Sequence, residues 1–411
     1  MKKCAHICLC TFSAVCGASS YAGGLWLNEV NDFAGGRASA GAPAGTDDAA
    51  SIMHNPASAT RLEGSQLFAA AGLLAPTVKF DTQYSSPRNG FNNGKDAGVL
   101  TPSGSLAYVH DLDSERWAAG VYLGAAAGAG LDYGSKWSGR YQAEEVSILI
   151  ATLAPTVSYK VTDALSIGAS LQYWYADLEL KVAVPRVNIT RPDGRATIDG
   201  DDTGFGFTLG AMYELGETTR FGILYQSELA PEFDGEVKLR LPDSPPPLDD
   251  NLDIASDTEL TMAEFVRFAI HQDMSDVWSV DFTIGWDNWS QLDNIILSTE
   301  RGTLGIPTQW RDTYHFAWGT QYRLNPSWTV TTGFAYDTNP VNARDRNAQL
   351  PIDRQIRVAF GARYDVRDTL TVGGYVNYAD LGKARIEAES FGGKYTDNEM
   401  WQFMVNANWT F

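Results

Sequence analysis

The chain has 411 residues, of which 44% are hydrophobic and 20% charged, with 50 acidic against 31 basic side chains and a formal net charge of −19. This charge excludes simple nucleic-acid binding, because a protein that neutralises phosphates needs a basic face. The longest charge-free apolar run beyond the N-terminus covers residues 117–131 and is too short for a bilayer-crossing helix, which needs about 20 apolar residues. A helical membrane protein is therefore excluded, but a membrane protein of another kind is not.

Residues 1–22 have the layout of a secretory signal peptide. Lys2 and Lys3 precede an apolar stretch, and Ser20 and Ala22 are the small residues that predict cleavage before Gly23. A lipoprotein signal at Cys16 is the alternative, but lipidation signals need a small residue before the cysteine, and Val15 is bulky. The exported chain is expected to have no thiol, disulfide or Cys-bound metal, because every cysteine lies in this segment: Cys4, Cys8, Cys10 and Cys16.

Residues 23–64 are rich in Gly, Ala, Asn and Asp and show no regular alternation of apolar and polar residues. They precede the first strand that the sequence predicts. The segment is expected to be either a periplasmic tail or an N-terminal hatch that plugs the lumen of the domain that follows.

From residue 65 to residue 411 the sequence alternates apolar and polar residues again and again, as expected of strands with one apolar and one polar face. The last strand is the clearest, with apolar side chains at every second position: Trp401, Phe403, Val405, Ala407, Trp409 and Phe411. Fourteen such segments are predicted, at 65–80, 103–112, 116–128, 146–161, 164–182, 203–215, 219–240, 258–273, 276–300, 312–324, 327–337, 354–366, 369–387 and 399–411.

The connections between these segments alternate between long loops and tight turns such as Thr162-Asp163 and Asn325-Pro326. An even strand count, an apolar outer face and long loops at one end only are typical of a bacterial outer-membrane barrel. A closed barrel also pairs every backbone group in hydrocarbon, which open sheets do not. The sequence therefore predicts an all-β, 14-stranded antiparallel transmembrane barrel over 65–411, plugged by the hatch. A soluble β-sandwich is the alternative.

Several short motifs carry a family resemblance. Taken in order along the chain they resemble the FadL/TodX (OmpP1) family of outer-membrane transporters of hydrophobic compounds and long-chain fatty acids. The motifs are Gly24-Leu25-Trp26-Leu27-Asn28-Glu29, Gly36-Arg37-Ala38, Asn55-Pro56-Ala57, Trp137-Ser138-Gly139-Arg140-Tyr141, Trp286-Asp287-Asn288-Trp289-Ser290, Arg311-Asp312-Thr313-Tyr314 and Tyr336-Asp337-Thr338-Asn339-Pro340-Val341.

The resemblance implies a passive channel in which an external groove built from loops captures the ligand, a lumenal pocket receives it, and hatch rearrangement releases it sideways into the membrane. The fold and the order of events come from the family and not from the spacing of residues. Long-chain fatty acids are the expected cargo. The alternatives are an aromatic-hydrocarbon channel of the same family and a general diffusion porin for polar solutes.

The hatch motif Asn55-Pro56-Ala57 is a candidate gating element, which the family places near the lateral opening. Proline fixes φ and removes a donor, and Asn bonds exposed backbone, so the motif predicts a rigid turn. Glycines in a strand mark bulges or a close approach of backbones. The stretch with Gly124, Gly128 and Gly130 is therefore the expected kink of the third strand, unless it is only a glycine-rich strand end.

Arginines on the polar strand faces are candidate anchors for a fatty-acid carboxylate, because a guanidinium grips a carboxylate with two hydrogen bonds. Arg267, Arg357 and Arg363 have inward parity, and Arg140 lies in a family-like motif. The alternative is that these arginines pair with carboxylates of the wall or the hatch.

An enzyme is not expected, because no nucleophile motif stands beside any histidine of the mature chain, and neither a cofactor nor a metal is expected. The expected partners are a hydrophobic small molecule, lipopolysaccharide and outer-membrane lipid. The barrel-assembly machinery is expected to recognise the C-terminal strand ending in Phe411. The protein is expected to be an exported, multi-pass outer-membrane monomer that binds no nucleic acid.

Overall fold

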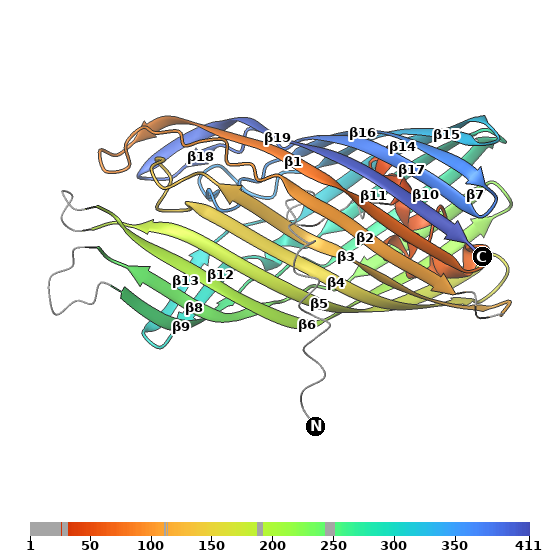
Figure 1. Ribbon diagram of the computed structural model, residues 1–411, viewed down its shortest axis with the longest axis horizontal. Helices are drawn as coiled ribbons and strands as arrows, with labels where there is room; N and C mark the ends of the chain where they lie inside the picture. The colour runs from red at the N-terminus through yellow and green to blue at the C-terminus, as the bar shows by residue number, and fades with distance from the viewer. Residues whose placement is uncertain (1–25, 27–31, 111, 113, 187–191, 243–250) are drawn as a thin grey trace, which may run out of the picture.

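The computed structural model describes residues 26, 32–110, 112, 114–186, 192–242 and 251–411, and the predicted signal peptide lies outside these residues. They form a closed antiparallel barrel of 14 strands, all joined by neighbouring ladders (Figure 1). The prediction of fold class is therefore confirmed. In order around the barrel the strands are β1 (Gln66–Ser85), β2 (Thr101–His110), β3 (Trp117–Asp132), β4 (Glu145–Lys160), β5 (Leu165–Val184), β6 (Gly194–Leu215), β7 (Thr219–Gln226), β10 (Phe265–Ser275), β11 (Trp278–Asp287), β14 (Thr313–Asn325), β15 (Trp328–Asp337), β16 (Gln355–Arg367), β17 (Leu370–Asp380) and β19 (Phe391–Thr410).

The barrel closes where the last strand pairs with the first. In that ladder Gln66 lies opposite Thr410 and Ser85 opposite Phe391. On β19 the apolar side chains Trp401, Phe403 and Val405 are exposed on the outer face, whereas the alternate residues point inward. A closed ladder leaves no edge strand, so the backbone of such a wall is satisfied without water.

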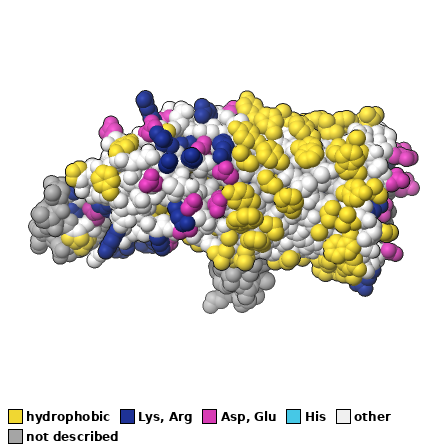
Figure 2. Space-filling model, turned by 90° about the horizontal axis from the view of Figure 1, so that it is seen from above, with side chains coloured by type: hydrophobic (Ala, Val, Ile, Leu, Met, Phe, Trp, Pro, Cys, Tyr) yellow, Lys and Arg dark blue, Asp and Glu magenta, His cyan; other side chains and the backbone are white. Residues whose placement is uncertain are grey.

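Side chains of different kinds gather at the two ends of the molecule. On the face in view, Figure 2 shows a broad apolar band over the half that carries the C-terminus, with Lys, Arg, Asp and Glu beyond it towards the other end and further acidic side chains at the rim of the near end. The described residues include no helix of the length and apolarity that crossing a membrane requires. We call the end near Phe411 the C-terminal end and the opposite one the extended end.

Four strands of the extended end continue beyond the barrel and form an extension, β8 (Glu232–Arg240), β9 (Asn251–Glu259), β12 (Asn294–Thr299) and β13 (Gly302–Pro307). β8 and β12 are the last parts of the predicted segments 219–240 and 276–300, and in both segments the backbone leaves the barrel ladder partway along. β9 and β13 lie mainly in the connections that follow these two segments. The prediction of 219–240 as one strand is therefore wrong at residues 227–231, where β7 ends and a stretch containing Pro231 precedes β8. Leu229 still bridges to Met262, but the Pro231 nitrogen has no proton to donate, so no continuous ladder joins β7 to β8. A short strand, β18 (Ile386–Glu387), lies against β19.

The residues before the first strand, 32–64, lie inside the barrel and are called the lumenal segment here. Its helical turns are η1 (Phe33–Arg37), η2 (Ala42–Ala44), α1 (Ser51–His54) and η3 (Pro56–Arg61), visible among the strands near the C-terminal end in Figure 1. The Gly41 amide donates to Thr283 Oγ1 of β11 over 2.8 Å, and the Ala57 carbonyl accepts from Ser158 Oγ of β4 over 3.1 Å. The segment therefore bonds to opposite sides of the wall. Its predicted start at residue 23 lies outside the described residues.

Candidate functional site

A gap in the wall separates β2 from β3. Their ladder ends at the pair Ser105↔Gly124, and one further bridge joins Gly98 to Leu131. Between those two pairings, the only described partners of β3 are β4 and Trp26. We call this interval, residues 99–104 facing 125–130, the window.

The glycine-rich stretch in which a kink is predicted, Gly124 to Gly130, begins at the last pair of the β2–β3 ladder and continues along the window. The register of β3 against β4 shifts between Ala125 and Ala127, so Ala126 is a bulged residue. Gly124 lies at the last pair with β2, whereas Gly128 and Gly130 keep their partners Leu149 and Ser147 on β4. A bulge bends and twists its strand, which turns β3 away from β2 and accounts for the gap.

Trp26 covers the inner side of the window. It forms an antiparallel bridge with Ala127, its indole Nε1 donates to the carbonyl of Ala263 over 2.8 Å, and its ring meets Phe265 edge-on at 5.5 Å. The side chain is 4% exposed. Trp26 thus ties the start of the described chain to β3 and to β10.

A cavity of about 50 Å³ begins behind Trp26 and is called the lower cavity. Its apolar lining comes from the wall and from the lumenal segment: Trp26, Ala42, Pro43, Met53, Ala126, Leu224 and Phe265. The lumenal segment and the inward faces of β7, β10, β11 and β14 contribute the polar part: Ser39, His54, Gln226, Arg267, Thr283 and His315. The cavity therefore has a hydrocarbon-like side that adjoins the window.

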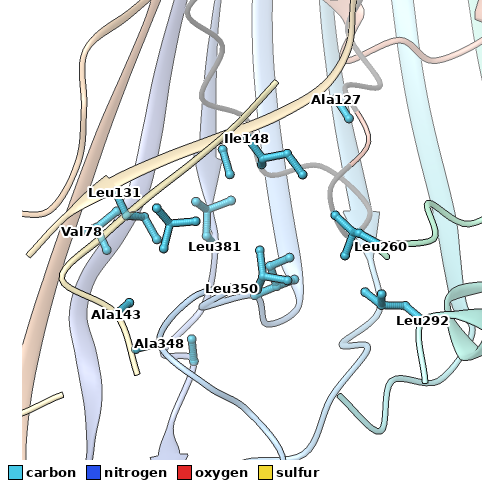
Figure 3. Close-up of a cluster of buried hydrophobic side chains, with 14 of the residues drawn as sticks. Val78, Ala127, Leu131, Ala143, Ile148, Leu260, Leu292, Ala348, Leu350 and Leu381 are labelled. Carbon is cyan, nitrogen blue, oxygen red and sulfur yellow. The ribbon is translucent and has the colours of Figure 1, made fainter. Parts of the chain in front are cut away.

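A second cavity, of about 60 Å³, lies towards the extended end and is called the upper cavity. Figure 3 shows Ile148, Leu260 and Leu350 reaching into this interior from the wall and a loop. Apart from Thr258 and Gln349, its lining is aliphatic: Val146, Ile148, Leu178, Leu180, Ile198, Leu260, Ile295, Leu297, Ile306 and Leu350. One buried hydrophobic cluster contains Ile148, Leu260 and Leu350 together with Trp26 and Ala126, so apolar side chains connect the two cavities.

Arg346 fixes the loop that supplies Leu350. Its guanidinium donates to the carbonyls of Val341, Ile352 and Arg385 over 2.7–2.8 Å. Burial lowers the pKa of this guanidinium below its ordinary value, since burial penalises the charged form, although Asp353 works in the opposite direction. The loop over the upper cavity is therefore held by hydrogen bonds from a buried arginine to backbone carbonyls, and not by an ion pair on the surface.

The Asn55-Pro56-Ala57 motif is fully buried and braces the lumenal segment. Asn55 Nδ2 donates to the carbonyls of Pro43 at 2.6 Å and Ala211 of β6 at 3.0 Å, while its Oδ1 accepts from the Ala57 amide. The last contact caps η3. The structure places the motif against β4, β5, β6 and β7, whereas the window lies between β2 and β3.

Each predicted carboxylate anchor lies next to a carboxylate of the chain itself. Arg140 lies in a loop at the extended end and pairs with Asp193 at 2.8 Å. The other three pairs are inside the barrel: Arg267 with Asp287 at 2.7 Å, Arg363 with Asp47 at 3.1 Å, and Arg357 with Asp337. Only Arg267 lines the lower cavity.

Sequence reasoning did not single out the aromatic and aliphatic residues that line the cavities. Trp26 was part of a family motif, and this was the one signal that pointed to it. The lining of the upper cavity comes from β9, β12 and β13 as well as from the barrel. The expected external groove of loops falls partly on residues 187–191 and 243–250, which lie outside the described ones. Among the residues described, no three His, Cys, Asp or Glu side chains form a metal-binding group.

Comparison with known proteins identifies the family to which the chain belongs. A family model described as outer membrane protein transport protein (OMPP1/FadL/TodX) matches residues 13–411. The long-chain fatty acid transport protein of Escherichia coli O6:H1 is 23% identical over 97% of this chain and 96% of its own length. Outer membrane protein P1 of Haemophilus influenzae strain Rd is 22% identical over 95% of this chain and 91% of its own.

Solved structures share the fold. A FadL homologue from Pseudomonas aeruginosa superimposes with a TM-score of 0.86 at 18% identity and covers 94% of this chain and 100% of its own. The Pseudomonas putida toluene transporter TodX gives a TM-score of 0.67 at 18% identity, over 87% of this chain and 92% of its own.

Proposed function

The chain belongs to the outer membrane protein transport family OMPP1/FadL/TodX, and from this premise we infer that it is a passive channel through which long-chain fatty acids and similar hydrophobic molecules enter the cell. Members of the family are transport channels for hydrophobic compounds in the outer membrane and are not enzymes. The extended end is accordingly the extracellular one. The cargo and the route are our proposal.

The proposed route runs from the upper cavity to the lower cavity and then through the window. The observation that carries it is the coincidence of the gap between β2 and β3 with Trp26 and Ala126, which line the lower cavity on its other side. A hydrophobic molecule that reaches the lower cavity then leaves sideways into hydrocarbon. A straight path to the periplasm would instead cross a lumen filled by the lumenal segment.

The lumenal segment acts in this proposal as the hatch. Ion pairs hold it to the wall, between Arg37 and Asp281 at 3.4 Å and between Asp47 and Arg363 at 3.1 Å. Trp26 belongs to the same stretch of chain and covers the window from inside, so a shift of the hatch moves the residue that blocks the exit. This coupling is the physical basis of the proposed gating by ligand.

The apolar lining of these cavities favours two cargo classes. Long-chain fatty acids are named by the relatives that match the whole chain, and toluene is named for a solved structure of the same fold. The general diffusion porin is the less suitable alternative, because the lumen is occupied by buried residues of the lumenal segment. Contacts with lipopolysaccharide, recognition of the strand ending in Phe411 by the assembly machinery and a monomeric state stay predictions.

A reversible lock across the window tests the route. The mature chain has no cysteine of its own, so Gly104→Cys with Ala125→Cys places two thiols one step above the last pair of the β2–β3 ladder. The matched control is Leu106→Cys with Leu123→Cys, two residues that face each other within that ladder. Labelled oleate and labelled toluene are then offered to a Gram-negative host that lacks its own fatty-acid channel.

We expect oxidation to abolish uptake only in the window pair and reduction to restore it. A fully cross-linked window pair that transports like the control pair would show that the cargo does not leave between β2 and β3. A well-assembled barrel that carries neither oleate nor toluene would contradict the proposed function itself.

A further inference from the structure

The ionisable side chains that line the two cavities are all paired. The upper cavity has none among the residues that line it, and the lower cavity has His54, Arg267 and His315. His54 Nε2 lies 3.0 Å from Asp32, Arg267 Nη2 lies 2.7 Å from Asp287, and His315 Nδ1 lies 2.8 Å from Asp337. Each of these three side chains already has a carboxylate beside it.

The Arg267 guanidinium illustrates how fully its donors are used. Besides its bond to Asp287 it donates to the carbonyls of Val266 and Trp286 through Nη1. Its Cζ atom lies 4.5 Å from the centre of the Phe265 ring. A bidentate grip on a second carboxylate needs a fork of N–H groups that point at the ligand. The N–H groups of Arg267 already point at Asp287 and at two backbone carbonyls of the wall.

The exit is apolar as well. Trp26, Ala126 and Ala127 line the window on the β3 side, and on the opposite side Val99 and Leu100 are 40% and 62% exposed. An ionised carboxylate taken from water into such surroundings loses its hydration and gains no partner, a cost that proteins avoid by neutralising the group. The aliphatic upper cavity and the apolar residues of the window therefore disfavour an anion, and in the lower cavity the arginine and the two histidines already face carboxylates.

We propose that cargo passes the two cavities and the window only in an uncharged form, either as a hydrocarbon or as a carboxylic acid that carries its proton. This inference rests on the proposed function and defines its substrate class. The pairing of Arg267 with Asp287 is the specificity-determining contact, because it keeps the one arginine of the lower cavity from holding an anion.

Two ligands of one chain length test the inference. Dibromostearyl alcohol is neutral and dibromostearyl sulfate is permanently anionic, and bromine quenches indole fluorescence on contact. Quenching is measured on the purified full-length barrel in micelles at equal ligand mole fractions. The signal of Trp26 is the difference between the unchanged protein and Trp26→Phe. We expect the alcohol to quench Trp26 at a mole fraction about tenfold lower than the sulfate.

The Asp287→Asn variant releases Arg267 from its carboxylate and is expected to tighten sulfate binding about tenfold. Adding Arg267→Gln should remove this gain. Asp397→Asn is the matched control, because Asp397 pairs with Lys79 on the outer surface at 3.2 Å and both side chains are about half exposed. If Asp287→Asn does not fold, Asp337→Asn is read in the same way, since Asp337 is the partner of His315.

Equal quenching of Trp26 by alcohol and sulfate in the unchanged protein would overturn the inference and leave the proposed function standing. A folded Asp287→Asn barrel with no gain for the sulfate would also overturn it. Failure of both ligands to quench Trp26 in a folded barrel would contradict the proposed route, and the inference with it.

Discussion

Trp26 and Ala127 form a bridge one residue beyond the bulge at Ala126, so the start of the described chain reaches β3 where that strand has lost its partner β2. The indole is held at its other end by the carbonyl of Ala263. Among the described residues, the Trp26 side chain therefore lies between the lower cavity and the gap in the wall, next to Ala126. Replacing Trp26 by a smaller residue therefore tests ligand binding in the lower cavity without removing a pair of the barrel ladder.

Trp26→Ala is expected to weaken hydrophobic ligand binding and to lower uptake several-fold, with little effect on barrel assembly. The change removes an aromatic wall of the lower cavity and the donor to Ala263, but no rung of the barrel ladder. Initial rates of oleate and toluene uptake measure the effect, and heat-modified mobility on gels reports assembly. Trp117→Ala is the control, because Trp117 lies at a strand end and is 48% exposed. Equal losses in both variants would contradict a special role for Trp26.

Gly210→Ala is expected to displace the lumenal segment and to raise the ionic conductance of the purified channel. A Cβ at Gly210 would overlap Asn55 Oδ1 and come within 2.9 Å of Pro56 Cδ, so the hatch has to move away from β6. Gly305→Ala, in the extension, adds a methyl group that meets nothing closer than 3.9 Å and is the matched control. Single-channel recording in planar bilayers measures both. Identical conductance in the two variants would argue that the hatch tolerates this shift.

The strands of the barrel could be predicted from the sequence because lipid imposes a strict alternation on the outer face. Phe403 and Val405 lie on the outer face and have to be apolar, whereas Gln402 and Asn406 lie on the inner face and can be polar. The same alternation continues into β8 and β9, although these strands leave the barrel, since an extension exposed to water on one side also has two unlike faces. Periodicity alone therefore could not locate the break at residues 227–231.

The pairing of the predicted anchors could not be derived from parity. Arg363 has inward parity, but its partner Asp47 belongs to the lumenal segment, more than 300 residues earlier in the chain. Arg267 and Asp287 lie on neighbouring strands whose register sets their separation, with Arg267 opposite Gly285. A sequence read one strand at a time predicts which face a charge occupies but not which opposite charge meets it.

Asn55→Ala is expected to loosen the lumenal segment without unfolding the barrel. The amide nitrogen of Asn55 serves the carbonyls of Pro43 and Ala211, and its loss leaves buried acceptors at a cost of about 1–3 kcal/mol. Hydrogen exchange of residues 43–62 should become faster, while exchange in β5 and β6 stays slow. Asn294→Ala, a change at an exposed residue of the extension, is the control. Unchanged protection in the lumenal segment would show that other contacts suffice to hold it.

Arg140→Ala is expected to loosen the loops of the extended end and to leave the affinity for anionic ligands unchanged. Arg140 bonds to Asp193 and also donates to the carbonyls of Arg88 and Asn89, so it ties the loop after β1 to the loop after β5. A group used in this way stabilises structure and has its charge compensated. Limited proteolysis should cut the loops of the variant faster, and sulfate quenching of Trp26 should match that of the unchanged protein. A clear loss of sulfate quenching would instead restore Arg140 as a carboxylate anchor, because a purely structural arginine has no reason to select the charge of the ligand.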